Sequence, residues 1–547
     1  MKNTPRMIQK RAQEVLMTKK ITSTLFILAV VFILLLGAVG FSACNKVEYA
    51  DTLIVGTTTV VDTLNRLDSA GGAPGYAYTM ISNTLTHIPL VYFEDGEYKS
   101  LLCDITARED GRTYVFALKD GFYWHDGVPV TVEDLKYTLQ NGLTDITVAV
   151  GNRSVAVTLD KAKATFLDGL RSVTLAPEHI VGNENKDTIS EAQAVIGCGP
   201  FRFARRNTDA GTLEFEKFAD YPYADDISVN RVIFKYYGSG DSMRLALKAG
   251  EIDMIWNYGY GLEADAVEDL KDQSNLQLAS FTTKAIPKVL FFNNTKLTDP
   301  RVKRAIRKAI DYDKIKRIFG TSESALPREG FVAPGILGFD GTAELARDLE
   351  GAKNLLLEAG YSESNKFEFE LLVRASGNDS QYADLIRTDL TETGMINVTL
   401  AVKGADWQSY YQEGRHTASL ASVTAGGYDF EAGYATRYLL TTNNSVMQAA
   451  GFVKNPVAHG QIAIENESGQ LTEFGVIRQE MAEAQTVEQL AAAVKKYQKY
   501  IADNSPCVAL MYDVKVQVHS KKLSGVKADP TFGILSVQGF NTLRKAV

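Results

Sequence analysis

Six histidines are the first residues to examine for chemistry, because imidazole serves both as a metal ligand and as a general base. They stand singly, at His87, His125, His179, His416, His459 and His519. None has a second histidine three or four residues away, the spacing that places two imidazoles on one face of a helix. The chain also lacks a GxSxG elbow, a Walker phosphate loop and an HExxH motif. The sequence therefore predicts no catalytic residues, no metal site and no cofactor.

Two further chemistries find only weak support. Gly259-Tyr260-Gly261 follows the apolar run from Ile252 to Trp256, as a dinucleotide-binding turn would, but the third glycine of that fingerprint is missing. A tight turn explains the pair better. Carboxylates are abundant, yet none shows a distinctive pairing, so glycosidase chemistry is unsupported.

The cysteines give no metal or redox motif. Three cysteines lie far apart in the body of the chain and form no CxxC motif: Cys103, Cys198 and Cys507. They allow at most one disulfide, and we expect buried free thiols. The sequence leaves their pairing open.

The charge of the chain is divided between two parts. The net charge is -8, but residues 1–43 carry six bases and one acid, so the remainder is at -13. An acidic body of this kind has no clustered cations to displace counterions from phosphates, which argues against nucleic-acid binding. At roughly 150 residues per domain, the 547 residues predict about three domains.

The amino-terminal segment is typical of export. Lys19 and Lys20 precede 25 uncharged residues from Ile21 to Asn45, a basic region followed by an apolar one. The segment ends in Phe41-Ser42-Ala43-Cys44, which resembles the lipobox of bacterial lipoproteins, with Phe in place of the usual Leu. That resemblance implies lipidation of Cys44 and removal of residues 1–43. The alternative is an uncleaved transmembrane anchor, since the apolar run is long enough to span a bilayer. The true start is either Met1 or Met17.

The rest of the chain alternates strand-like and helix-like stretches without a repeat or a Pro-rich or Gly/Ser-rich linker, which predicts an α/β fold. We expect a strand region from Thr113 to Trp124 and helices opened by Thr131, by Asp299 with Pro300, and by Thr486. A further helical stripe contains Leu345, Leu349, Ala352 and Leu356 and stops at Gly360.

Five segments, in this order, are similar to one known family. LKDGFYWHDGVPVTVEDLKYTL resembles the signature of the family-5 extracellular solute-binding proteins, the oligopeptide- and dipeptide-binding components of ABC importers. VIGCGPFRF is similar to the family's GTGPY segment, with Cys198 in place of Thr. The matching segments are 118–139, 195–203, 246–255, 291–315 and 352–361. His125, in the first segment, has a structural explanation, because Asp126-Gly127 makes a turn and Thr131 starts a helix.

The resemblance implies a two-lobed periplasmic-binding-protein-like fold with a hinged cleft between the lobes. Domain I would be discontinuous, formed by residues 44–85, 196–287 and 508–547. Domain II would be inserted at 86–195, and the second lobe would span 288–507.

The same resemblance implies a function. The chain would be an extracytoplasmic, lipid-anchored and non-enzymatic receptor that captures short peptides and delivers them to a permease, with ATP hydrolysed by other subunits. We expect a monomer. Other members carry nickel chelates, haem or sugars, so a non-peptide solute is the alternative; an anchored extracellular hydrolase is a third.

The ligand-binding residues are carried over from the family's peptide motif. In peptide-binding members, an acid in a GWxADYxxPxxFL segment holds the ligand's ammonium group. An ungapped alignment places Tyr428 at the Trp and Glu431 at the Asp, with Ala435 replacing the proline. Asp429 is the candidate if the alignment slips by two residues, and a solvated loop acid is the structural alternative.

Four further residues complete the candidate site. Arg374 lies one residue out of register with an arginine that binds the ligand carboxylate in some dipeptide-binding members. Trp407 resembles a recurrent family aromatic that also suits packing. Trp256 and Tyr258 follow a predicted strand end, where cleft residues often lie.

Overall fold

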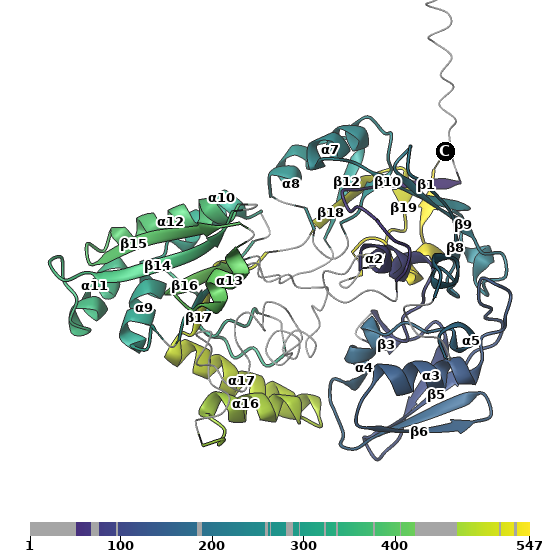
Figure 1. Ribbon diagram of the computed structural model, residues 1–547, viewed down its shortest axis with the longest axis horizontal. Helices are drawn as coiled ribbons and strands as arrows, with labels where there is room; N and C mark the ends of the chain where they lie inside the picture. The colour runs from purple at the N-terminus through teal and green to yellow at the C-terminus, as the bar shows by residue number, and fades with distance from the viewer. Residues whose placement is uncertain are drawn as a thin grey trace, which may run out of the picture. The chain divides into compact units, whose positions relative to one another are not determined.

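The structure is a computed structural model of the whole chain (Figure 1). It describes residues 51–546, except for 67–75, 95–96, 183–188, 258–260, 263, 281–287, 295, 322–323, 335–336, 376–377, 405, 422–467, 514–515 and 530–532. The amino-terminal segment with Cys44 lies outside the described residues. Among the described residues, no helix has the length and hydropathy needed to cross a bilayer.

A seven-stranded mixed sheet is built around strand β1. Its order is β12-β18-β11-β1-β10-β9-β8, and β1 runs parallel to both of its neighbours, β10 and β11. Nearly every residue of β1 is buried, as expected for a central strand covered on both faces. The strands are β1 (Thr52–Thr57), β8 (Phe201–Asn207), β9 (Thr212–Lys217), β10 (Arg231–Tyr236), β11 (Met254–Ile255), β12 (Leu276–Ser280) and β18 (Val516–Ser520).

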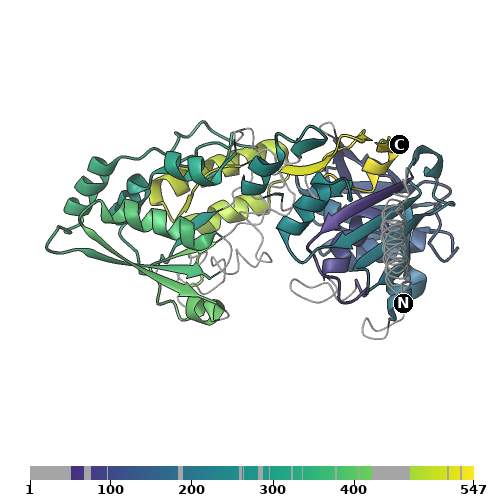
Figure 2. The ribbon, with the colours of Figure 1, turned by 90° about the horizontal axis from the view of Figure 1, so that it is seen from above.

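Three distant stretches of the chain contribute to this sheet. Strand β18, close to the carboxyl terminus, pairs antiparallel with β11 and β12. Both views show the yellow carboxyl-terminal segment beside the purple and teal strands (Figures 1 and 2). This sheet is therefore built from segments that are far apart in sequence, and the domain boundaries given above stay predictions.

A second sheet follows the order β4-β5-β7-β6 and is antiparallel throughout. The strand expected from Thr113 is confirmed, and it ends at Leu118, before the Asp120-Gly121 turn. The strands are β4 (Cys103–Ala107), β5 (Thr113–Leu118), β6 (Ile146–Gly151) and β7 (Ser154–Leu159). Short strands and helices complete this region: α2 (Tyr76–Leu85), β2 (Tyr92–Glu94), β3 (Glu97–Lys99), α4 (Phe166–Gly169), α5 (Glu178–Val181) and α6 (Glu191–Ala194).

A five-stranded sheet follows the order β15-β14-β16-β13-β17. Helix α12 packs on β14 and β15, and its buried face joins the apolar core of the sheet. The strands are β13 (Val289–Phe292), β14 (Phe367–Arg374), β15 (Ile396–Lys403), β16 (Ala418–Ala421) and β17 (Cys507–Ala509). The helices are α9 (Pro300–Ala309), α10 (Tyr312–Phe319), α11 (Leu349–Glu358), α12 (Asp379–Thr391) and α13 (Trp407–Gln412). The remaining elements are α7 (Gly240–Lys248), α8 (Ala264–Leu270), α16 (Glu473–Ala482), α17 (Val487–Asn504), β19 (Leu523–Ser524) and β20 (Arg544–Lys545).

The helix starts expected at Asp299 and Thr486 are confirmed. The Asp299 side chain accepts from the backbone N–H of Arg301, with proline in the first turn, and Thr486 accepts from Gln489. One helix boundary differs. Helix α11 begins at Leu349, because Asp348 caps it by accepting from the Gly351 N–H, so Leu345 lies before the helix.

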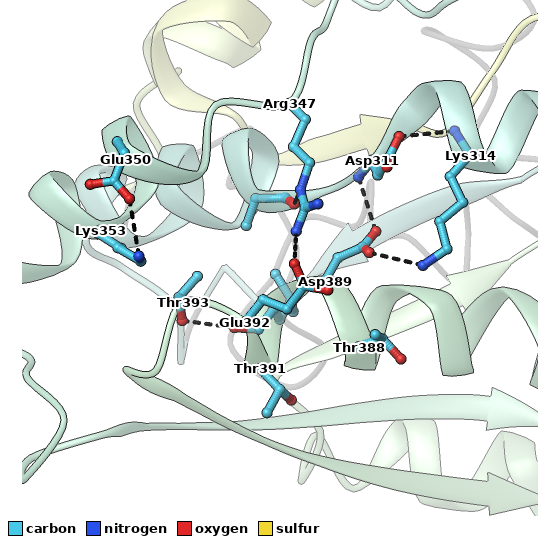
Figure 3. A network of polar contacts seen from close by, with 12 residues as sticks. Asp311, Lys314, Arg347, Glu350, Lys353, Thr388, Asp389, Thr391, Glu392 and Thr393 are labelled. Carbon is cyan, nitrogen blue, oxygen red and sulfur yellow. Dashed lines mark hydrogen bonds and ion pairs between the residues drawn. The ribbon is translucent and has the colours of Figure 1, made fainter.

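A polar network links α10, α12 and the segment before α11 (Figure 3). Asp389 is fully buried, and its carboxylate accepts from the Asp311 N–H at 2.9 Å and lies 3.5 Å from Lys314 Nζ. Burial raises the pKa of Asp389. Arg347 pairs with Glu392 and donates to the Ala309 carbonyl at 3.1 Å. These contacts fix α10 relative to α12.

The VIGCGPFRF segment owes its glycines to close backbone packing. A Cβ atom on Gly197 would lie 1.9 Å from the Thr86 carbonyl oxygen, and one on Gly199 would lie 2.5 Å from that of Leu85. The Gly199 N–H donates to the Thr86 carbonyl at 2.9 Å. Any larger residue would push these chains apart. Cys103 and Cys198 are buried free thiols, as expected, whereas the free thiol Cys507 is only partly buried. Burial raises the pKa of each of the three to about 12.

His125 lies in the same packed region. Its ring contacts the Gly199 carbonyl at 3.1 Å, accepts from the Gly197 N–H at 3.3 Å and meets the Phe218 ring edge-on at 4.9 Å. These contacts give the His125 side chain a structural role in holding the packed region together.

Asp134 is the stabilising residue of helix α3 (Val132–Gly142), and we predict that Asp134→Ala lowers the free energy of unfolding by about 3 kcal/mol or more. Its carboxylate is 3% exposed and accepts from Thr131 N at 2.8 Å, Trp124 Nε1 at 3.3 Å and Glu178 N at 2.8 Å. The alanine variant leaves these donors without an acceptor. Urea unfolding measures the loss, with the exposed Glu133→Ala as the control. Equal midpoints for the two variants would contradict this role.

A second prediction concerns acid stability. Burial lowers the pKa of His125 to about 4, and the same cause lowers that of His416 to about 4. Between pH 6.5 and 4 the unfolded chain therefore takes up protons that the folded chain does not, so stability falls as the pH falls through this window. His125→Asn removes one such proton. We expect a shallower fall of unfolding free energy in this window, measured by urea titration at several pH values; an unchanged slope would show that His125 does not contribute.

Candidate functional site

Three parallel strands of the five-stranded sheet end at one edge. Strand β14 pairs in parallel with β15 on one side and with β16 on the other. Their last residues, Arg374, Lys403 and Ala421, therefore lie on the same side of the sheet. In open α/β sheets, ligands bind beyond the carboxyl ends of the strands, where the connections leave in opposite directions. This edge is the first candidate site.

Arg374 presents an exposed guanidinium group at the end of β14. The guanidinium carbon lies 3.8 Å from the centroid of the Trp407 ring, which is the geometry of a cation–π contact. Within the described part of the chain, Arg374 makes no ion pair. The stacking orients the planar guanidinium group, and no described acid neutralises its charge.

The two neighbouring cations differ from Arg374 in this respect. Lys403 Nζ lies 3.4 Å from an Asp406 carboxylate oxygen, and Arg415 pairs with Glu413 at 2.5 Å. Their charges are already matched by local acids. Arg374 is thus the better partner for an incoming anion.

Trp407 supports Arg374 from within the lobe. It is 2% exposed and stacks on Tyr411 with centroids 5.1 Å apart, and Tyr411 stacks on His416 at 4.9 Å. His416 lies two residues before β16. One aromatic column therefore joins the end of β14 to the start of β16, and the burial of Trp407 assigns its ring to packing beneath the guanidinium.

The residues of the predicted peptide motif lie outside the described residues. Tyr428, Asp429 and Glu431 belong to segment 422–467, which directly follows β16. The chain therefore enters this segment from the same edge at which Arg374 ends β14. Their part in the site stays a prediction.

The aromatic pair predicted after β11 is divided in the same way. Trp256 follows the strand as expected, but it is 1% exposed and packs edge-to-face on Phe234 at 5.4 Å. Its ring lies in the core of the seven-stranded sheet, and its backbone N–H donates to the Gly56 carbonyl at 3.0 Å. Tyr258 lies outside the described residues.

A cavity of about 350 Å³ lies where β1 and β10 end, and sequence reasoning missed it. Its lining comes from three parts of the chain: residues 57–62, 206–213 and 234–236, with Ile81 of α2. Only the apolar pair Val60-Val61, shortly after a buried strand, hints at it in the sequence. In the described residues, no group of three His, Cys, Asp or Glu side chains is placed to hold a metal ion.

Comparison with known proteins identifies the family. Residues 98–445 match the model described as "Bacterial extracellular solute-binding proteins, family 5 Middle". A dipeptide-binding protein of Bacillus subtilis, DppE, is 20% identical over 466 residues, which cover 77% of this chain and 80% of the relative.

Solved structures share the fold. A periplasmic binding protein of Helicobacter pylori, DppA, in complex with the peptide STSA, aligns with a TM-score of 0.66 at 20% identity, covering 91% of this chain and 98% of that one. NikZ of Campylobacter jejuni, in complex with Ni(L-His), aligns with a TM-score of 0.69 at 20% identity, covering 91% of this chain and 100% of that one. The chain therefore belongs to family 5 of the bacterial extracellular solute-binding proteins, the non-enzymatic binding components of ABC transporters.

Proposed function

We propose that this protein is a lipid-anchored receptor that binds short peptides and delivers them to an ABC permease. The observation that carries the proposal is the exposed guanidinium of Arg374, held flat on Trp407 and without a carboxylate partner among the described residues. Such a group suits the free carboxylate of a peptide, because a guanidinium binds a carboxylate through two parallel charge-assisted hydrogen bonds.

The opposite end of a peptide needs an anion. Glu431, or Asp429, is the proposed partner of the α-ammonium group, and both lie in the segment that leaves β16 beside Arg374. An arginine and an acid acting together would match the two charges of a zwitterionic ligand. Closure of the two lobes would exclude water and strengthen both pairs, and the closed form would be the one presented to the permease.

Relatives support this assignment, since DppE is a dipeptide-binding protein and DppA was solved with a peptide. A nickel chelate is the second candidate, because NikZ shares the fold and was solved with Ni(L-His). The L-histidine of such a chelate also carries a carboxylate, so Arg374 alone does not distinguish a peptide from a nickel chelate. The ammonium partner does, since only a peptide-type ligand with a free amino terminus uses it. Anchoring through Cys44 remains part of the proposal.

The carboxylate role of Arg374 is tested with a peptide and its C-terminal amide. A pool of di- to tetrapeptides is screened by isothermal titration, and the tightest peptide is then compared with its amide. We predict that the wild type binds the free acid at least tenfold more tightly, and that Arg374→Gln removes this preference, a loss of about 1.4 kcal/mol. Arg387→Gln is the matched control, because Arg387 is an arginine of the same lobe that pairs with Asp384 at 2.8 Å. If Arg374→Gln still prefers the free acid, Arg374 does not bind the carboxylate. If no peptide pool binds with a dissociation constant of about 1 mM or lower, the peptide assignment is wrong.

The ammonium role of Glu431 is tested separately. We predict that Glu431→Ala weakens binding of the same peptide at least tenfold, because the substitution removes a charge-assisted pair. It leaves the affinity for the N-acetylated peptide unchanged. Titration of both peptides against Glu431→Ala and Asp429→Ala identifies the acid. If neither variant changes the affinity, the alignment of the peptide motif is wrong.

A further inference from the structure

The cavity at the ends of β1 and β10 has no part in the carboxylate and ammonium contacts proposed above. It is bounded by the segment that follows β1, by the turn between β8 and β9, and by the last residues of β10. Its buried lining is apolar: Ile81 is 0% exposed, Leu213 is 6% exposed and Phe234 is 1% exposed. The cavity thus opens onto the hydrophobic core of the seven-stranded sheet.

Two large apolar side chains remain exposed at its mouth. Val60 is 51% exposed and Tyr236 is 41% exposed, and both line the cavity. Apolar side chains that remain exposed around an apolar hollow gain free energy when an apolar group covers them.

Among the described residues, the charged and amide groups at the mouth have partners or face water, whereas the Thr212 hydroxyl in the lining is buried without a hydrogen-bond partner. Arg206 donates to the Asp62 carbonyl at 3.1 Å and to a Glu191 carboxylate oxygen at 3.4 Å. The Asn207 side chain accepts from the Ala210 N–H at 3.0 Å, and the Thr57 hydroxyl accepts from the Thr59 N–H at 3.1 Å. The Asp62 carboxylate is exposed, so solvent screens its charge. A charged ligand group would lose its water here without gaining a buried ionic partner.

We propose that this cavity binds an uncharged apolar group of side-chain size, aromatic or branched aliphatic. Its volume of about 350 Å³ lies at the small end of the range of about 300–1,000 Å³ for ligand pockets, so it holds a side chain or a small molecule rather than a whole peptide. The group has two possible sources: a side chain of a bound peptide, or a free small molecule. The pocket itself does not depend on the ligand proposed for Arg374.

Methyl NMR of the full chain tests the pocket directly, because Ile81 and Leu213 carry methyl groups in its lining. The first probe is p-cresol, and its charged analogue is 4-hydroxybenzylamine. We expect p-cresol to shift the methyl signals of Ile81 and Leu213 in a saturable manner, and the amine to bind at least tenfold more weakly.

Tyr236→Ser removes one side of the mouth and is expected to weaken the binding of p-cresol at least fivefold. Tyr123→Ser is the matched control, because Tyr123 is 40% exposed and does not line the cavity. Both residues are at the surface, so folding tolerates either change, and melting curves verify this. Val61→Trp, which fills the cavity, provides a second variant with the same expected loss.

A dipeptide arm separates the two sources. If the occupant is a peptide side chain, Ala-Leu shifts the same methyl signals, and Tyr236→Ser weakens Ala-Leu but not Ala-Glu. If it is a free molecule, p-cresol shifts them and Ala-Leu does not. The proposal is overturned if neither probe shifts these signals, if the amine binds as well as p-cresol, or if Tyr236→Ser and Tyr123→Ser behave alike. Because p-cresol carries no peptide group, its result stands whether or not the protein binds peptides.

Discussion

The parallel pairing of β14 with both of its neighbours is the constraint on which the candidate site depends. Because β15, β14 and β16 point the same way, Arg374 and the start of segment 422–467 emerge at one edge of the sheet. Parallel pairing brings side chains together that are dozens of residues apart in sequence. The aromatic column from Trp407 to His416 then connects the end of β14 to the start of β16 through α13.

Charge compensation explains why one cation at this edge is available to a ligand. Lys403 and Arg415 are matched by acids a few residues away, whereas Arg374 contacts the face of a tryptophan and pairs with no acid in the part of the chain that the structure describes. An aromatic face orients a guanidinium without neutralising it. The group therefore keeps both its planarity and its charge for binding.

Local signals in the sequence predicted much of the fold. The caps at Asp299 and Thr486 and the strand from Thr113 depend on neighbouring residues, and the structure confirms them. The ordered family segments identified the family. The boundary of α11 was missed because the capping hydrogen bond of Asp348 outweighs the apolar periodicity that includes Leu345.

The site was less predictable, because its properties arise from tertiary contacts. Trp256 and Trp407 were both candidates for ligand binding, the first because it follows a predicted strand end and the second because it resembles a recurrent family aromatic. Trp256 is packed into a core, whereas Trp407 forms the base beneath an exposed arginine. The cavity near β1 combines stretches that are far apart in sequence, from residues 57–62 to residues 234–236, so no local pattern reveals it. The central claim, that the protein carries short peptides, is tested most directly by native mass spectrometry of the protein as purified, followed by denaturation and sequencing of any released ligand. The account predicts bound peptides with free carboxyl termini; a bound metal chelate, haem or sugar would contradict it.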